Sequence, residues 1–202
     1  QDAGYEAIPM QGSGTFAIES MLGSVVGSDA TLLVLVNGAY GRRIHAIAER
    51  LGIKSSTLEC AEHEVPDPSL VEEALGKGVT HLAAVHCETT TGILNPIETY
   101  ADLAARAGIV LMVDAMSSFG GYEIDIAALP ATYLVASSNK CLEGTPGLGF
   151  VIANRAHLQT TQGIARSVSL DLLAQWEGLN RNGQFRFTPP THVLLAFHKA
   201  LE

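Results

Sequence analysis

The sequence predicts an α/β domain with a mostly parallel β-sheet, and two observations carry this prediction. Short apolar runs alternate with amphipathic stretches along almost the whole chain, which is the pattern of strands connected by helices. Several of the runs are almost continuously apolar, as in Leu-Leu-Val-Leu-Val at residues 32–36. Strands that are covered on both faces have this composition, because helices shield both sides of a parallel sheet.

Six strands and four helices follow from this pattern. The expected strands are residues 31–36, 53–58, 80–86, 109–114, 133–137 and 148–152. The expected helices are residues 15–26, 41–51, 68–76 and 96–107. The first has apolar residues at helical spacing, and Pro96 suits the first position of the fourth, where a proline loses no hydrogen bond. Residues 163–186 are less regular, and we expect loops and short helices there.

Composition excludes several classes of protein. The chain has 202 residues, of which 47% are hydrophobic and 16% charged, as in globular rather than disordered proteins. A net charge of -9 without a basic run argues against nucleic acids and anionic membranes as partners. The three cysteines form no CxxC pair, and no signal peptide or 18-residue apolar run is present. We therefore predict a reducing, cytoplasmic location.

Lys140 is the first candidate for chemistry. It follows the apolar run at residues 133–136 and precedes a glycine-rich loop. A lysine at the end of a buried strand is expected to be desolvated, which lowers the pKa of the ammonium group. A neutral amine is what Schiff-base chemistry with pyridoxal phosphate requires. The alternative is a solvated loop residue.

A second candidate site lies just before the first helix, in the segment Gln11-Gly12-Ser13-Gly14-Thr15. Glycines let the backbone approach a ligand closely, and the start of a helix offers free N–H groups and a positive dipole. Ser13 and Thr15 add hydroxyl groups, so the segment is suited to bind phosphate. The alternative is that Ser13 or Thr15 caps the helix. The segment is not a Walker A loop, because it lacks Gly-Lys-Ser/Thr, and it is not a dinucleotide motif, because no strand pattern clearly precedes it.

Polar or aromatic residues also follow three of the predicted strands. Asp114 ends one strand, and ligands of open α/β sheets bind beyond the carboxyl ends of strands. A carboxylate there is suited to hold a protonated pyridine nitrogen, or else to cap the strand end. Tyr40 could stack on a flat ring or pack on the core. Thr90 and Thr91 could meet a phenolic oxygen or a substrate group, or belong to a simple turn.

These segments resemble, in their order along the chain, those of class V aminotransferases. The shared motifs are residues 11–17, 37–41, 88–92, 113–118 and the Lys140 segment. Residues 138–141, 144–150 and 187–192 are most similar to the branch of that family that transfers the amino group of 2-aminoethylphosphonate to pyruvate. The resemblance implies a fold type I large domain, which is a three-layer α/β/α structure around a mostly parallel sheet. It also implies pyridoxal 5′-phosphate as cofactor and no metal.

The resemblance implies a role for each matching residue. Lys140 forms the aldimine with the cofactor and carries the proton, and Asp114 pairs with the pyridinium nitrogen. Tyr40 stacks on the ring. Further cofactor contacts are implied for Ser13, Gly14, Thr15, Thr90 or Thr91, and Thr188. Thr188 matches a threonine that reaches the phosphate of a neighbouring subunit, which implies a homodimer with shared sites, acting on a small amino donor and a 2-oxo acid.

The resemblance also implies that the chain is a fragment. Residues 1–190 correspond to the large domain without its beginning, and residues 191–202 to the start of a connection to a smaller domain beyond Glu202. That smaller domain carries the arginine that binds the anionic end of the substrate. Arg42 and Arg43 are expected to be surface or helix-start residues instead. One alternative is another aminotransferase of the same class, acting on alanine or serine. A cysteine desulfurase is disfavoured, because no histidine stands directly before Lys140. A third alternative is a catalytically incomplete or non-catalytic module.

Overall fold

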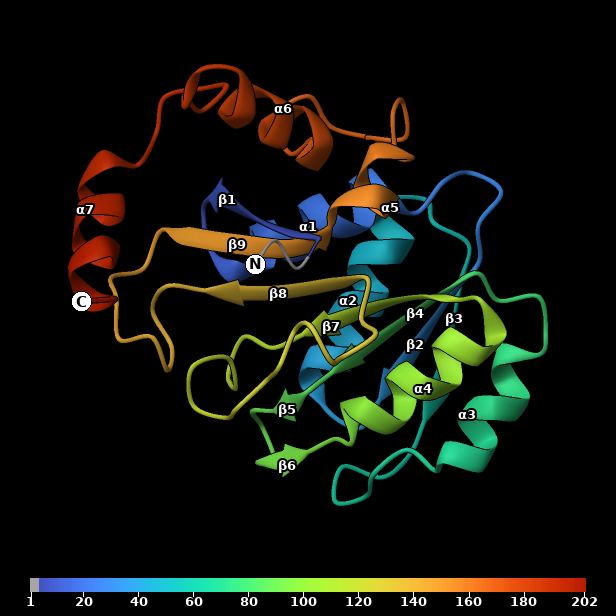
Figure 1. The fold of residues 1–202 in the computed structure, drawn as a ribbon. Helices are drawn as coiled ribbons and strands as arrows, with labels where there is room; N and C mark the ends of the chain where they lie inside the picture. Colours follow the sequence, from blue (N-terminus) through green and yellow to red (C-terminus); the bar gives the residue numbers. More distant parts are fainter. Residues whose placement is uncertain (1–3) are drawn as a thin grey trace.

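The computed structural model describes residues 4–202 and has a seven-stranded sheet at its centre (Figure 1). The first three residues of the predicted large domain lie outside the described residues. The strand order is β1-β9-β8-β7-β4-β2-β3. The bounds are β1 (Tyr5–Gln11), β2 (Leu32–Val36), β3 (Ser55–Glu59), β4 (His81–Val85), β7 (Val110–Asp114), β8 (Tyr133–Ser137) and β9 (Leu148–Asn154).

The sheet is mostly parallel, as predicted. Neighbouring strands from β3 to β8 pair in parallel, whereas β9 pairs antiparallel with both β8 and β1. A small hairpin of β5 (Cys87–Glu88) and β6 (Ile93–Leu94) extends from the end of β4. The five parallel strands therefore end at one edge of the sheet, and the loops that follow them lie on the same side of the molecule.

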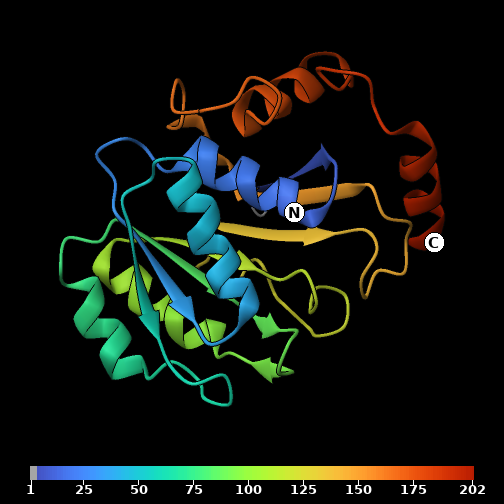
Figure 2. The ribbon, with the colours of Figure 1, turned by 180° about the vertical axis from the view of Figure 1, so that it is seen from behind.

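Helices cover both faces, which confirms the predicted α/β fold of three layers (Figures 1 and 2). They are α1 (Gly14–Val25), α2 (Ala39–Arg50), α3 (Pro68–Leu75), α4 (Ile97–Ala107), α5 (Arg155–Gln159), α6 (Leu172–Asn182) and α7 (Thr191–Ala200). β2 is apolar at every position because both of its faces are buried. Leu32 and Val34 belong to the core under α1 and α2, whereas Leu33 and Leu35 belong to the core under α3 and α4.

A strand does lead into the glycine-rich segment, although no clear strand pattern precedes it in the sequence: β1 ends at Gln11. Its sequence, YEAIPMQ, carries a proline and a glutamate and lacks the continuous apolar run of the buried strands. An edge strand tolerates this composition. A proline has no N–H to donate, and an edge strand is hydrogen-bonded to a neighbouring strand on one side only. β1 is at the edge, with Pro9 opposite Phe150 of β9.

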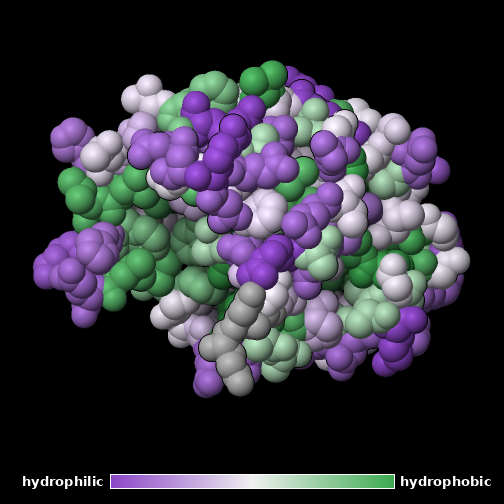
Figure 3. All heavy atoms as spheres, turned by 45° about the horizontal axis from the view of Figure 1, so that its top comes forward, coloured by the Kyte–Doolittle hydropathy of each residue, from purple (hydrophilic) through white to green (hydrophobic). Residues whose placement is uncertain are grey.

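Helix α7 packs loosely on this core, whereas α6 contributes Leu172 and Leu173 to it. Helix α6 has eleven residues, where loops and short helices were expected, and α7 has no buried residue. An apolar groove of about 310 Å³ lies between α7 and the outer strands, and Figure 3 shows hydrophobic side chains gathered on that side. The groove is lined by Ala7, Pro9, Phe119, Leu142, Leu148, Phe150, Ile152, Leu194, Phe197 and Leu201. Within residues 4–202, no helix combines the length and apolar character needed to cross a membrane.

Candidate active site

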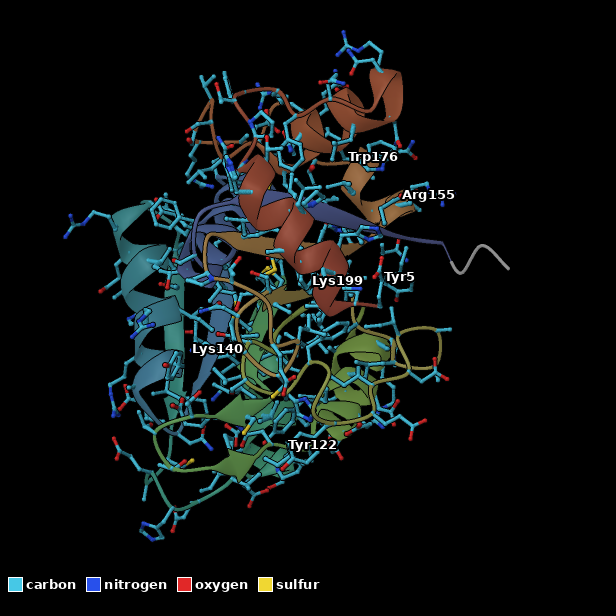
Figure 4. All side chains as sticks on the ribbon, turned by 90° about the vertical axis from the view of Figure 1, so that its left-hand side faces the viewer. Tyr5, Tyr122, Lys140, Arg155, Trp176 and Lys199 are labelled. Carbon is cyan, nitrogen blue, oxygen red and sulfur yellow. The ribbon has the colours of Figure 1, made fainter. Side chains whose placement is uncertain are left out.

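Most of the candidate residues lie near the edge of the sheet where the parallel strands end, on several different elements. Figure 4 looks onto this edge, with Lys140 in the loop after β8. Asp114 is the last residue of β7, and the charges of Glu88, Arg43 and Lys140 all act on its carboxylate. The topology thus brings together groups that are up to about a hundred residues apart in sequence.

Asp114 is the most unusual residue of the site. Its side chain is only 2% exposed, and Oδ1 accepts a hydrogen bond from the Met116 amide at 2.9 Å. Oδ2 is buried and has no partner among the described residues. The pKa of the carboxyl group is raised to about 6, chiefly by burial and to a smaller extent by the charge of Glu88, while the Met116 hydrogen bond, Arg43 and Lys140 act in the opposite direction. A cationic N–H donor placed at Oδ2 would remove this cost.

The start of α1 is suited to bind an anion. Ser13 is the N-cap residue, yet its hydroxyl makes no capping hydrogen bond, and no acidic residue lies in the first turn. The Ser13 carbonyl accepts from the amides of Phe16 and Ala17. The first-turn amides of Gly14 and Thr15 precede these and have no acceptor within the helix. The Ser13 side chain therefore does not cap the helix. Its hydroxyl and the amides of Gly14 and Thr15 remain available to a ligand.

Glycine at position 14 allows close packing beside Asp114. A Cβ atom there would lie 2.2 Å from the sulfur of Met116, which is two residues after Asp114. A Cβ at Gly149 would lie 2.7 Å from Cβ of Ala17 and 3.2 Å from the Ser13 carbonyl. Both glycines therefore let α1 approach the strand ends closely. This brings the candidate anion-binding site at Ser13 toward the end of β7, where Asp114 lies.

Tyr40 lies in the first turn of α2, directly after the end of β2. Its ring is half-buried, and the guanidinium of Arg43 lies over it at 4.6 Å from the ring centroid. Arg42 and Arg43 are both exposed, as expected, and Arg42 pairs with Glu62. The Tyr40 amide donates to Glu88 Oε2 at 3.1 Å. Glu88 thus holds the backbone of Tyr40, and Arg43 of the same helix packs against one face of its ring.

The two candidate threonines lie in the turn of the β5–β6 hairpin, and their side chains are exposed. The Thr90 hydroxyl donates to Glu88 Oε1 at 2.7 Å, and the Thr91 hydroxyl lies 3.4 Å from the Glu88 carbonyl oxygen. Thr90 therefore belongs to the same hydrogen-bond cluster as the Tyr40 amide. Its role toward a cofactor stays a prediction.

The expectation that Lys140 is desolvated was wrong for this chain, because the side chain is exposed. The buried strand ends at Ser137, and the chain turns outward over Ser138 and Asn139 before it reaches the lysine. The loop itself is well fastened. The Ser138 hydroxyl donates to the Thr145 carbonyl at 2.6 Å, and the Gly144 amide donates to the Ser138 carbonyl at 2.7 Å. Lys140 is thus held at the site without being shielded from water.

Thr188 lies in the connection between α6 and α7, and its side chain is exposed. No hydrogen bond to Ser13, Asp114 or Lys140 brings it into the site within the described residues. Its predicted contact was with a second subunit, and this stays a prediction.

Sequence reasoning missed the central part that Glu88 plays in this cluster. A glutamate beside threonines in a polar turn gives no sign of burial, yet Glu88 is fully buried. One signal was present in the sequence. Gly38 precedes α2 and has no side chain with which to cap it, so the acceptor had to come from another segment.

Comparison with known proteins identifies the class to which this fold and site belong. The profile described as Aminotransferase class-V matches residues 4–202. The chain therefore belongs to the class V aminotransferase family, which confirms the resemblance found in its motifs.

Curated relatives show which branch of the family this chain is most similar to. A protein of Aeromonas hydrophila named 2-aminoethylphosphonate–pyruvate transaminase is 52% identical over 200 residues, which are 98% of this chain and 53% of that protein. A Klebsiella pneumoniae protein of the same name is 50% identical, over 98% of this chain and 55% of its own length. The chain thus spans about half the length of these curated relatives.

Solved structures agree with the fold. The alanine–glyoxylate aminotransferase of Nostoc sp. matches 96% of this chain with a TM-score of 0.89 and 27% identity, over 53% of its own length. The ureidoglycine–glyoxylate aminotransferase of Bacillus subtilis matches 97% of this chain with a TM-score of 0.87 and 26% identity, over 52% of its length.

Proposed function

We propose that the protein containing this chain transfers the amino group of 2-aminoethylphosphonate to pyruvate, giving phosphonoacetaldehyde and L-alanine, with pyridoxal 5′-phosphate as cofactor. The buried carboxylate of Asp114, with one oxygen unpartnered, is the observation that carries the proposal. Membership of the class V family supports the reaction type. Relatives that are 50–52% identical and bear this substrate pair in their names support the donor and acceptor.

The residues present fit such a cofactor. A ring nitrogen that carries a proton would give Asp114 Oδ2 the donor that it lacks. The free hydroxyl of Ser13 and the first amides of α1 would hold a phosphate group, and Tyr40 offers an aromatic face at the same edge of the sheet. When bound, pyridoxal phosphate supplies an electron sink and a carbonyl carbon that accepts an amine.

Each residue then has a defined task. Lys140 would hold the cofactor through Nζ and, as a free amine, would accept and return the proton of the substrate carbon. Asp114 would stay ionised beside a cationic ring nitrogen, because that charge would lower the pKa of the carboxyl group from its raised value. The exposure of Lys140 leaves room for an amine substrate to approach its side chain.

The remaining assignments are part of the same proposal. Residues 1–190 make up the large cofactor-binding domain, and residues 191–202 begin a connection to a smaller one; the absence of buried residues in α7 supports this division. We also propose a homodimer in which Thr188 reaches the phosphate group in the partner's site, a role supported by its exposed side chain. A cytoplasmic location follows from the proposed metabolic reaction and the free cysteines.

A substrate panel tests the proposal. The purified protein with pyridoxal phosphate is given 2-aminoethylphosphonate, alanine or serine as donor, and pyruvate or glyoxylate as acceptor. We expect the highest kcat/KM for 2-aminoethylphosphonate with pyruvate. Asp114→Ala should nearly abolish turnover, whereas exchanging the exposed Asp102 for Ala should not. A clear preference for alanine or serine with glyoxylate would contradict the substrate assignment, and normal turnover of Asp114→Ala would remove Asp114 from the mechanism.

A further inference from the structure

Glu88 is a fully buried carboxylate at the end of β5 and belongs to none of the roles described so far. No cationic side chain pairs with it within residues 4–202. Instead, Oε2 accepts from the Tyr40 amide at 3.1 Å, and Oε1 accepts from the Thr90 amide at 3.3 Å and from the Thr90 hydroxyl at 2.7 Å. Burying an ionised carboxylate is costly unless donors of this kind compensate for the lost water.

The carboxylate does for α2 what an N-cap residue does for an ordinary helix. The N-cap position is Gly38, which has no side chain, and Glu88 supplies the acceptor for the first-turn amide from a different strand. The negative charge also complements the positive end of the helix dipole. The absence of a side chain at Gly38 is what admits Glu88, since a Cβ there would lie 2.3 Å from both Cγ and Cδ of the glutamate.

The start of α2 and the turn of the β5–β6 hairpin are therefore joined at one buried group. The first turn of α2 carries the ring of Tyr40, whose face is packed against Arg43. The hairpin turn carries the hydroxyl of Thr90. The position of each relative to Asp114 depends on the carboxylate between them.

We propose that Glu88 is a positioning residue of the cofactor site, which holds Tyr40 and Thr90 in the orientation that a planar cofactor needs above Asp114. This inference rests on the proposed function. Glu88 touches neither substrate nor cofactor and acts through Tyr40 and Thr90.

The test compares Glu88→Gln and Glu88→Asp with the control Glu73→Gln, which removes an exposed glutamate of α3 that pairs only with Lys77. Gln keeps the size but has one acceptor oxygen, and Asp keeps the charge but is one carbon shorter. Far-UV circular dichroism checks folding. Absorbance titration with pyridoxal phosphate gives Kd, induced circular dichroism of the bound cofactor reports ring orientation, and borohydride reduction with mass analysis reports attachment at Lys140.

We expect both Glu88 variants to bind the cofactor roughly tenfold more weakly, the scale of one lost charge-assisted hydrogen bond, and to change the induced dichroism, while Glu73→Gln behaves as wild type. In a Tyr40→Ala background, Glu88→Gln should have little further effect on Kd, because the ring that it positions is gone. A folded Glu88 variant with wild-type Kd and dichroism, or full additivity with Tyr40→Ala, overturns the inference.

The failure of the inference is distinguishable from the failure of the proposed function. If wild type attaches the cofactor at Lys140 and the Glu88 variants do so equally well, only the positioning role is wrong. If wild type takes up no cofactor, both proposals are wrong. Should neither Glu88 variant fold, hydrogen exchange of the Tyr40 amide in wild type decides, because exchange as fast as that of an unbonded amide contradicts the cap.

Discussion

Replacing Asp114 with asparagine should stabilise the cofactor-free chain at neutral pH. Asparagine has nearly the same shape, and its side-chain oxygen can still accept the hydrogen bond from the Met116 amide that Oδ1 accepts at 2.9 Å. What the replacement removes is a buried negative charge whose second oxygen has no partner. The residue proposed to hold the cofactor nitrogen is thus expected to cost stability while the cofactor is absent.

The size of the effect follows from the pKa of Asp114. Burial raises this pKa from 3.8 in the unfolded chain to about 6 in the folded chain. The folded state therefore binds a proton more readily, and its stability relative to the unfolded state rises as the pH falls from above 6 toward 3.8. A difference of about two pKa units corresponds to about 3 kcal/mol. Asp114→Asn should gain about this amount above pH 7 and almost nothing near pH 4.

Urea unfolding of the cofactor-free chain at pH 7.5 and pH 4 measures this difference, with the exposed Asp102→Asn as control. Comparing variants at the same pH cancels the contributions of other titrating groups, including the buried histidines. The control should stay within about 0.5 kcal/mol of wild type at both pH values. If Asp114→Asn is no more stable than wild type at pH 7.5, or if its gain is equal at both pH values, the buried, unpartnered carboxylate does not cost the stability inferred here.

The structure makes two further predictions about stability. The pKa of His81 is lowered from 6.5 to about 4, chiefly by burial and in smaller part by His157. Stability that is present above pH 6.5 is therefore lost as the pH falls toward 4, by about 3 kcal/mol. An NMR titration in which His81 protonates near pH 6.5 in the folded chain would contradict this. Gly41→Ala should destabilise the chain by roughly 1–3 kcal/mol, because the new Cβ would lie 2.7 Å from the Leu35 carbonyl oxygen. Gly23→Ala lies in α1, and its new Cβ would have its nearest contact at 3.6 Å. This variant should leave the free energy of unfolding unchanged or raise it by roughly 0.5–1 kcal/mol. Urea unfolding measures both variants, and equal changes in the free energy of unfolding would refute the packing argument.

The parallel sheet could be predicted because its strands are buried on both faces. β2 and β8 are apolar at almost every position, and all five residues of each are buried. β1 could not be predicted in this way, since an edge strand with Pro9 follows no continuous apolar pattern. The β5–β6 hairpin has two residues in each strand, which is too short for any periodicity to show.

The candidate site could be predicted where position in the fold determines it. Asp114 was placed by the end of an apolar run, and the structure has it there. Lys140 was expected to be desolvated for the same reason, but a turn of two residues after the strand is enough to bring a long side chain back into water. The role of Glu88 depends on contacts between the β5–β6 hairpin and residue 40 at the start of α2, and single-sequence reasoning has no access to such contacts.

The central claim is that Lys140 and Asp114 form one cofactor site at the edge of the sheet. The most direct measurement is reductive trapping, in which the protein is incubated with pyridoxal phosphate, reduced with borohydride, digested and analysed by mass spectrometry. The account predicts that the modification is found on Lys140, that Lys140→Ala removes it, and that the exposed Lys77 and Lys199 stay unmodified under the same conditions. Modification spread evenly over these exposed lysines, or a signal unchanged in Lys140→Ala, would contradict it.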